Sequence, residues 1–313
     1  MAVARRALIT GVSGQDGYYL ARHLLDRGRE VLGVSRGRPS HPAGTHRVLD
    51  ISEHAKLREL ISEFAPDEIY HLAAYHRSSA AGVSLSEKEE EELYFRNNIE
   101  STRALLRATL ELRPRCRIFL AGSCHLFGNA QVSPQSETTP IRPNSLYGIT
   151  KANNFWLGQY YRQSLGMFCA TGILYNHESP LRGPTFVTTK IASAAARIAA
   201  GLEEELVLGD LDAQVDWGFA GDYVEAMVHM LEGDEPEDLI IGSGELHRVR
   251  DFAELAFAHV GLDWRLHVRQ ADGLHHPVAR TVYFGDTTRI RKRGWAPRVP
   301  FPELVRQMVD AHR

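Results

Sequence analysis

The sequence predicts an α/β fold in which a doubly wound parallel sheet is followed by a smaller C-terminal region. Short apolar runs alternate with longer amphipathic stretches over the first 175 residues, as parallel strands joined by crossover helices do. A glycine-rich turn follows the first apolar run, and the alternation loosens after about residue 176. We therefore expect two regions, residues 1–175 and 176–313, that are partly interleaved.

The short apolar runs are expected to form buried strands, because each is continuous and bounded by turn or helix signals. They are Arg6–Thr10, Glu30–Ser35, Asp67–His71, Arg117–Ala121 and Met167–Leu174, with a further strand before Asp50. The amphipathic stretches are expected to form helices, at Gln15–Arg27, His54–Phe64, Ser86–Glu111, Ser145–Leu165 and Thr188–Leu202. Residues 176–184 contain two prolines and a glycine and are expected to form a loop.

The composition favours a cytoplasmic globular protein. Lys and Arg number 36 and Asp and Glu 39, a net charge of −3, which argues against broad binding to nucleic acid. No apolar run reaches the roughly 18 residues of a membrane-spanning helix. The three cysteines are few and lack metal-site spacing, so we expect a reducing compartment and no metal.

A turn with glycines at positions 11, 14 and 17 follows the first predicted strand. Residues without Cβ let the backbone approach a pyrophosphate, and the next helix directs its free N–H groups at that anion. The strand before the turn and the helix after it predict a dinucleotide site and a fold of the Rossmann type. The residues expected to contact the dinucleotide there and at later strand ends are Gly11, Ser13, Gly14, Gln15, Asp16, Gly17, Arg36, Asp50, Ile51, Leu72, Ala73 and Ala74.

The end of the second predicted strand favours NADP over NAD. Enzymes that prefer NAD usually place an acidic residue there for the ribose 2′-hydroxyl, whereas this chain has Ser35 and Arg36. A guanidinium complements a 2′-phosphate. We expect NADP as the cofactor, with NAD as the alternative, and Asp50 as an acceptor for the adenine amino group.

Tyr147 and Lys151 form a YxxxK pair at the start of a predicted helix, and this spacing puts both side chains on one face. A nearby ammonium is expected to lower the pKa of the tyrosine, so that the phenol exchanges a proton with an alcohol oxygen while hydride moves to nicotinamide. Ser123, just past a predicted strand, can hold the same oxygen. We expect all three to be catalytic, and Tyr147 and Lys151 to contact the dinucleotide as well.

These motifs make the chain resemble the extended short-chain dehydrogenase/reductases (the NAD-dependent epimerase/dehydratase family), and among them the GDP-mannose 4,6-dehydratases. Matching stretches are ALITGVSGQDGYYLARHLL, PDEIYHLAA, RPNSLYGITKANNFW and GILYNHESPLRGPTFVTTK. The resemblance implies a nucleotide-diphosphate sugar, GDP-linked above all, that is oxidised at carbon 4 and bound by residues 176–313. It also implies that Asn176 and Lys190 contact this substrate, that Asn98 supports the active-site helix, and that two long helices build a homodimer or homotetramer.

The chain departs from the family pattern at three places. His125 stands where the family has a glutamate that removes the carbon 5 proton and helps expel water from carbon 6. Histidine is an acid or base near neutral pH, so we expect His125 either to replace this glutamate or only to line the pocket. The family's arginine before Asp-Trp-Gly is Val215 here, and its later Arg-Pro is His276-Pro277. Arg182 or Arg280 is expected to supply the missing charge at the substrate.

Three groups of functions follow from these alternatives. If His125 removes the carbon 5 proton, the product is a 4-keto-6-deoxy sugar. If it does not, the enzyme is a 4-oxidoreductase, a 4-keto reductase or a 4-epimerase. A non-catalytic dinucleotide-binding regulator, the alternative of another class, would be expected to lack the Tyr147–Lys151 pair.

Overall fold

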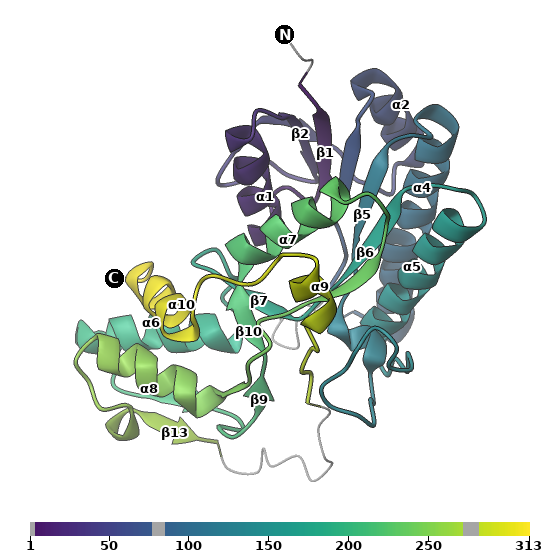
Figure 1. Ribbon diagram of the computed structural model, residues 1–313. Helices are drawn as coiled ribbons and strands as arrows, with labels where there is room; N and C mark the ends of the chain where they lie inside the picture. The colour runs from purple at the N-terminus through teal and green to yellow at the C-terminus, as the bar shows by residue number, and fades with distance from the viewer. Residues whose placement is uncertain (1–3, 77–84, 272–281) are drawn as a thin grey trace.

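The computed structural model describes residues 4–76, 85–271 and 282–313 (Figure 1). Its centre is a sheet of seven parallel strands in the order β11-β6-β5-β4-β1-β2-β3. The strands are β1 (Arg6–Thr10), β2 (Glu30–Ser35), β3 (Thr45–Val48), β4 (Glu68–His71), β5 (Arg117–Ala121), β6 (Cys169–Leu174) and β11 (Asp238–Ile241). The chain crosses from one half of the sheet to the other between β3 and β4, so the predicted doubly wound fold is confirmed.

Helices cover both faces of this sheet (Figure 1). On one face lie α1 (Gln15–Asp26) and α7 (Ala220–Glu232), whose apolar side chains share a core with β1 and β6. On the other face lie α2 (His54–Phe64), α4 (Ser101–Leu112) and α5 (Leu146–Gln163). No helix in the described ranges is long and apolar enough to cross a membrane.

The stretch 86–111 is helical but not one regular helix as predicted. It consists of α3 (Glu87–Tyr94), a π-helical segment η1 (Phe95–Glu100) and α4. Ser86 and Glu89 form a capping box at the start of α3, which explains why the acidic run begins a helix. The wider π turn buries the side chains of Asn97 and Asn98, and such turns are frequent at functional sites.

The second region has its own core, and α6 (Val187–Ala199), α8 (Val249–His259) and α10 (Phe301–Asp310) pack around it. The predicted loop at 176–184 begins instead with a strand, β7 (Asn176–Glu178), because β10 (Trp217–Phe219) supplies a parallel partner. The smaller elements are η2 (Cys124–Phe127), β8 (Leu206–Leu208), β9 (Gln214–Val215), β12 (His247–Arg248), η3 (Trp264–Leu266), β13 (Val268–Gln270) and α9 (Thr288–Lys292). The chain returns from this region to the main sheet through α7 and β11.

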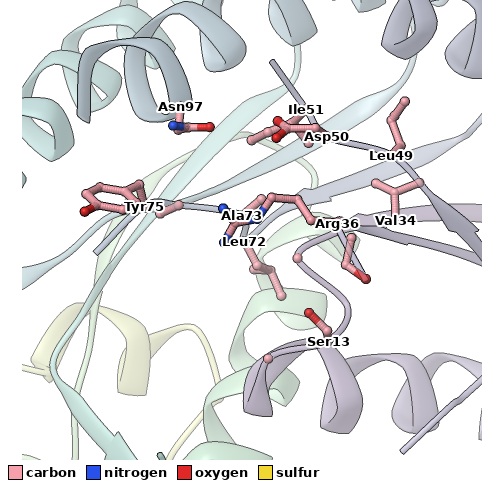
Figure 2. A pocket seen from close by; sticks show the side chains of 14 residues that line it. Ser13, Val34, Arg36, Leu49, Asp50, Ile51, Leu72, Ala73, Tyr75 and Asn97 are labelled. Atoms are coloured by element: carbon pink, nitrogen blue, oxygen red, sulfur yellow. The ribbon is translucent and has the colours of Figure 1, made fainter. Parts of the chain in front are cut away.

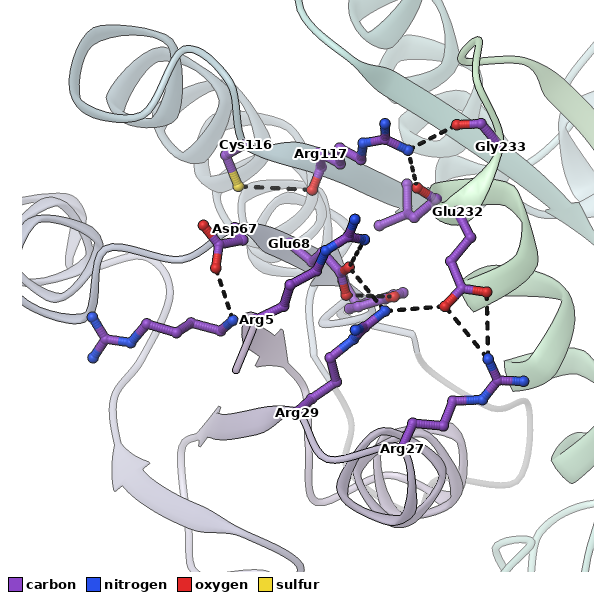
Figure 3. Close-up of polar contacts among 12 residues, drawn as sticks. Arg5, Arg27, Arg29, Asp67, Glu68, Cys116, Arg117, Glu232 and Gly233 are labelled. Carbon is purple, nitrogen blue, oxygen red and sulfur yellow. Dashed lines mark hydrogen bonds and ion pairs between the residues drawn. The ribbon is translucent and has the colours of Figure 1, made fainter. Parts of the chain in front are cut away.

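An ion-pair network centred on the buried Glu68 lies at the amino-terminal ends of the sheet strands (Figure 3). Glu68 at the start of β4 is 1% exposed and pairs with Arg5 at 3.2 Å and with Arg29 at 3.5 Å. The hydroxyl of Tyr70 donates to the same carboxylate, and Arg29 also pairs with Glu232 of α7 at 3.0 Å. The network therefore ties β4 to the start of β1, to the turn before β2 and to α7.

We expect Glu68→Ala to lower the free energy of unfolding by about 1–3 kcal/mol, because it leaves the buried hydroxyl of Tyr70 without its acceptor. Urea denaturation measures this loss. Glu30→Ala removes an exposed ion pair with Arg6 and is the matched control, with an expected loss below about 1 kcal/mol. Equal losses in the two variants would show that Glu68 does not stabilise the sheet edge in this way.

Candidate functional site

The candidate site is a cleft along the carboxyl ends of the sheet strands. It consists of two adjoining hollows that share residues of the β1–α1 turn and of the segment after β4, namely Gly11, Ser13, Gly14, Leu72 and Ala74. One hollow runs toward the ends of β2 and β3 (Figure 2). The other, of about 520 Å³, runs toward β6 and β7 and brings together Ser123, His125, Tyr147, Lys151, Asn176 and Arg182.

The turn between β1 and α1 is built from close backbone contacts. Gly11 has a φ of +79°, and a Cβ there would lie 2.8 Å from the backbone N of Ala73. A Cβ at Gly17 would lie 2.5 Å from the Cα of Val12. Gly14 precedes α1 without a side-chain cap, so the first N–H groups of the helix are left for a ligand. The turn therefore fits a pyrophosphate.

The hollow at β2 and β3 has the lining of an adenosine site. Figure 2 shows Arg36, Asp50 and Leu72 around it, each from a different strand end. Asp50 accepts a hydrogen bond from the backbone N–H of Ser52 at 2.9 Å. Ser35 donates its hydroxyl proton to the carbonyl of Gly37 at 2.7 Å, and the exposed Arg36 lines the hollow beside it.

Two residues predicted to contact the dinucleotide turn their side chains to the segment after β6. Gln15 donates to the carbonyl of His177 at 2.9 Å and accepts from the Ser179 hydroxyl at 2.8 Å. Asp16 Oδ2 lies 2.9 Å from His177 Nε2. Burial raises the pKa of Asp16, but the charges of His177 and Arg182 outweigh this effect and hold the pKa below its usual value. Burial also opposes charge on His177, yet Asp16 raises the pKa of this imidazole, and the two form an ion pair.

Ser123, Tyr147 and Lys151 meet at the carboxyl end of β5. Ser123 precedes η2, and the other two lie in the first turns of α5. Lys151 Nζ donates to the carbonyl of Ala121 at 2.6 Å and lies 5.5 Å from the centroid of the Tyr147 ring. Burial lowers the pKa of Lys151 to about 8, and the charge of Asp16 opposes this change.

The acidity of Tyr147 differs from the sequence prediction. Burial raises the pKa of this phenol, whereas a hydrogen bond with Ser123 and the charge of Arg182 oppose the rise. The pKa is therefore shifted upward and not downward as predicted, because burial is the larger effect, and Lys151 Nζ is bound to the carbonyl of Ala121.

Two imidazoles pack edge-on against the Tyr147 ring. The ring centroid of His125 lies 5.8 Å from that of Tyr147 and 5.0 Å from that of Tyr283. The ring centroid of His76 lies 4.5 Å from that of Tyr147. Burial lowers the pKa of both histidines, that of His76 to about 4. The sequence analysis missed His76, and its place just after a predicted strand end was the signal that could have found it.

The structure brings Asn176 and Arg182 to the cleft, together with His177 and Phe186, which the sequence analysis did not select. The Arg182 guanidinium lies 3.5 Å from the centroid of the Phe186 ring, and its Nε lies 3.1 Å from Glu178 Oε2. Lys190 is exposed on α6 and is not part of the cleft lining. Arg280, His276 and Pro277 lie outside the described residues, and Val215 lies in β9.

Asn98 of η1 joins α5 to the segment after β4. Its Nδ2 donates to Thr150 Oγ1 at 3.1 Å and to the carbonyl of Tyr75 at 3.0 Å. Its Oδ1 accepts from the backbone N–H of Tyr75 at 2.6 Å. Asn154 donates to the backbone carbonyl of Asn98 at 2.9 Å. Asn98 therefore supports the helix that carries Tyr147, as the resemblance implied.

We expect Gly17→Ala to disrupt the β1–α1 turn, because the new methyl group overlaps the backbone of Val12. The expected cost is about 1–3 kcal/mol of stability together with weaker NADPH binding, measured by urea denaturation and by fluorescence titration. Gly37→Ala is the control, since nothing lies within 4 Å of the position that its new methyl group would take. A Gly17→Ala protein as stable and as tightly NADPH-binding as Gly37→Ala would contradict the close packing of this turn.

Sequence comparison extends over nearly the whole chain. A family model described as GDP-mannose 4,6 dehydratase matches residues 8–308. The chain is 38% identical over 344 residues to GDP-mannose 4,6 dehydratase of Homo sapiens, covering 97% of this chain and 90% of that protein. It is 37% identical over 331 residues to GDP-mannose 4,6 dehydratase 1 of Arabidopsis thaliana, covering 97% and 88%.

The fold also matches solved structures. The UDP-glucose 4-epimerase of Thermus thermophilus, solved in complex with NAD, has a TM-score of 0.83 and 24% identity, and the match covers 98% of each chain. The shared fold is the parallel sheet with flanking helices that is typical of Rossmann folds. The sequence match is more specific than the shared fold, and it shows that this enzyme belongs to the GDP-mannose 4,6-dehydratase family.

Proposed function

We propose that this enzyme is an NADP-dependent 4,6-dehydratase that acts on a GDP-sugar, with GDP-mannose as the first candidate. The observation that carries the proposal is that Ser123, Tyr147 and Lys151 line the same hollow as the glycine turn of Gly11, Gly14 and Gly17. The family relationship supports dehydration over simple oxidation. Arg36 favours NADP, and NAD is the alternative.

The glycine turn supports a bound dinucleotide, since Gly11 and Gly17 leave no room for a Cβ and α1 begins without a side-chain cap. When bound, the nicotinamide supplies a hydride acceptor and later a hydride donor. Tyr147 takes the proton of the carbon 4 hydroxyl, and Ser123 holds the oxygen. The charges of Arg182 and Lys151 lie near the phenol and stabilise the phenolate that accepts this proton, against the effect of burial.

Dehydration requires a base for carbon 5, and we assign this step to His125. The 4-ketone makes the carbon 5 proton acidic, and the neutral imidazole accepts it. The electron pair of the C5–H bond becomes the second bond between carbons 5 and 6, the C6–O bond breaks, and the imidazolium returns its proton to the departing hydroxyl. One molecule of water leaves, and His125 is neutral again. Burial keeps the pKa of His125 below its usual value, so the imidazole starts in the form that accepts a proton.

His125→Ala is expected to lower the rate of dehydration by about 10²–10⁴-fold, the usual contribution of a general acid–base group. The rate is measured by mass spectrometry of the sugar nucleotide after incubation with GDP-mannose. With the wild type the product is lighter than GDP-mannose by one water, and with the variant the product is the ketone, which is lighter by two hydrogens. Tyr147→Phe is the comparison variant and should form neither product. Dehydration at the wild-type rate in His125→Ala would exclude this imidazole from the step.

The pH dependence should report Lys151. Burial lowers its pKa to about 8, so the charged form is present below this pH and is lost above it. We expect kcat/KM to fall above about pH 8 in the wild type. In Lys151→Arg the residual activity should not fall between about pH 8 and 10, because a guanidinium stays charged there. If the activity of both proteins falls over the same alkaline pH range, the group that titrates there is not Lys151.

We also infer a homodimer formed through α5, with a homotetramer as the alternative. Ile149, Trp156 and Tyr160 are 42%, 53% and 54% exposed, and their spacing places them on one face of α5. Trp156→Glu should dissociate the dimer at micromolar concentration in light scattering. Leu266→Glu, at an exposed site on η3, should leave the dimer intact. A monomeric wild type would refute the dimer.

A further inference from the structure

We propose that the contact between Gln15–Asp16 and His177–Ser179 couples the two ligands of the cleft, so that dinucleotide binding tightens nucleotide-sugar binding and the reverse. This inference rests on the proposed function and adds a positioning role for Asp16 and His177. The contact joins the turn whose backbone N–H groups would bind the dinucleotide to the segment that carries Arg182 and Phe186.

The contact is direct and is made by side chains from both segments. Gln15 bonds to the carbonyl of His177 and to the hydroxyl of Ser179, and Asp16 pairs with the His177 imidazole. His177 Nδ1 also donates to the carbonyl of Tyr175 at 2.7 Å, so both ring nitrogens are donors, as in an imidazolium. A shift of the α1 turn therefore has to move His177 and Ser179 or break these bonds.

Ser179 in turn sets the position of Arg182. The backbone N–H of Leu181 donates to Ser179 Oγ at 3.1 Å, and the backbone N–H of Arg182 donates to the carbonyl of Ser179 at 2.9 Å. Arg182 is then held between Glu178 and Phe186. A ligand that fixes the position of either segment thus helps to fix the other, which is the physical basis of coupled binding.

Electrostatics explain why each ligand should strengthen the binding of the other and not weaken it. Asp16 lies in the first turn of α1, where its charge would repel a pyrophosphate. The paired His177 imidazolium cancels this repulsion, so an anionic dinucleotide binds better when the contact is formed. A diphosphate at Arg182 favours the same arrangement, because it needs the segment 177–182 in place. Both ligands therefore stabilise one state of the contact.

The test measures the affinity of NADPH by fluorescence titration with and without saturating GDP, and the affinity of GDP with and without NADPH. In the wild type each ligand should tighten the other by the same factor, about 5-fold or more. Asp16→Asn, which keeps the side-chain shape, should reduce this factor to near one. Ser179→Ala, which removes a single hydroxyl, should reduce it even where Asp16→Asn is too unstable to study.

Asp50→Asn is the matched control. Asp50 lines only the adenosine hollow, so this variant should weaken NADPH binding without changing the coupling factor. If the coupling factor is unchanged in both Asp16→Asn and Ser179→Ala while both ligands still bind, the coupling proposal is overturned and the proposed function is not. If GDP does not bind the wild type, the proposed function on a GDP-sugar is overturned, and UDP replaces GDP in the same test of the coupling; failure of both nucleotides would overturn the coupling as well.

Discussion

Buried hydrogen bonds between amides and hydroxyls fix α5 against the sheet, and the candidate active site depends on them. Asn154 donates to Thr102 Oγ1 at 3.0 Å, and Thr102 donates to the carbonyl of Asn98. The same network reaches the glycine turn, because His71 bridges Thr102 and Thr10 through its two ring nitrogens. Buried polar groups of this kind are costly to leave unpaired. One hydrogen-bond network therefore joins the catalytic helix to the strand that leads into the dinucleotide turn.

Local sequence patterns were sufficient for the parts of the fold that repeat a simple rule. The apolar runs that became β1, β2 and β5 were predicted at their observed bounds, and the glycine turn was predicted from its spacing together with the strand before it and the helix after it. The π-helical segment and β7 were not predictable in the same way. A π turn has no distinct side-chain pattern, and β7 exists because β10, about forty residues later, pairs with it.

The candidate site likewise has parts that local sequence patterns predict and parts that they do not. The positions of Ser123, Tyr147 and Lys151 follow from strand ends and helix spacing. The surroundings of these groups depend on contacts between distant segments. His76 meets Tyr147, and His177 meets Asp16, across gaps in the sequence that no local pattern spans. The raised pKa of Tyr147 likewise reflects burial, which sequence spacing does not report.

The charge balance of the cleft gives a reason why an imidazole can stand at position 125. Lys151 and Arg182 are cations near the phenol, while the carboxylates Asp16 and Glu178 are paired with His177 and Arg182. A neutral His125 leaves the cleft one charge more positive than a carboxylate would, which suits a diphosphate ligand. The imidazole is a weaker base in these surroundings than in water, because burial disfavours its charged form. For the same reason the imidazolium is a stronger acid than in water, so the group that accepts the carbon 5 proton also returns it readily to the leaving hydroxyl.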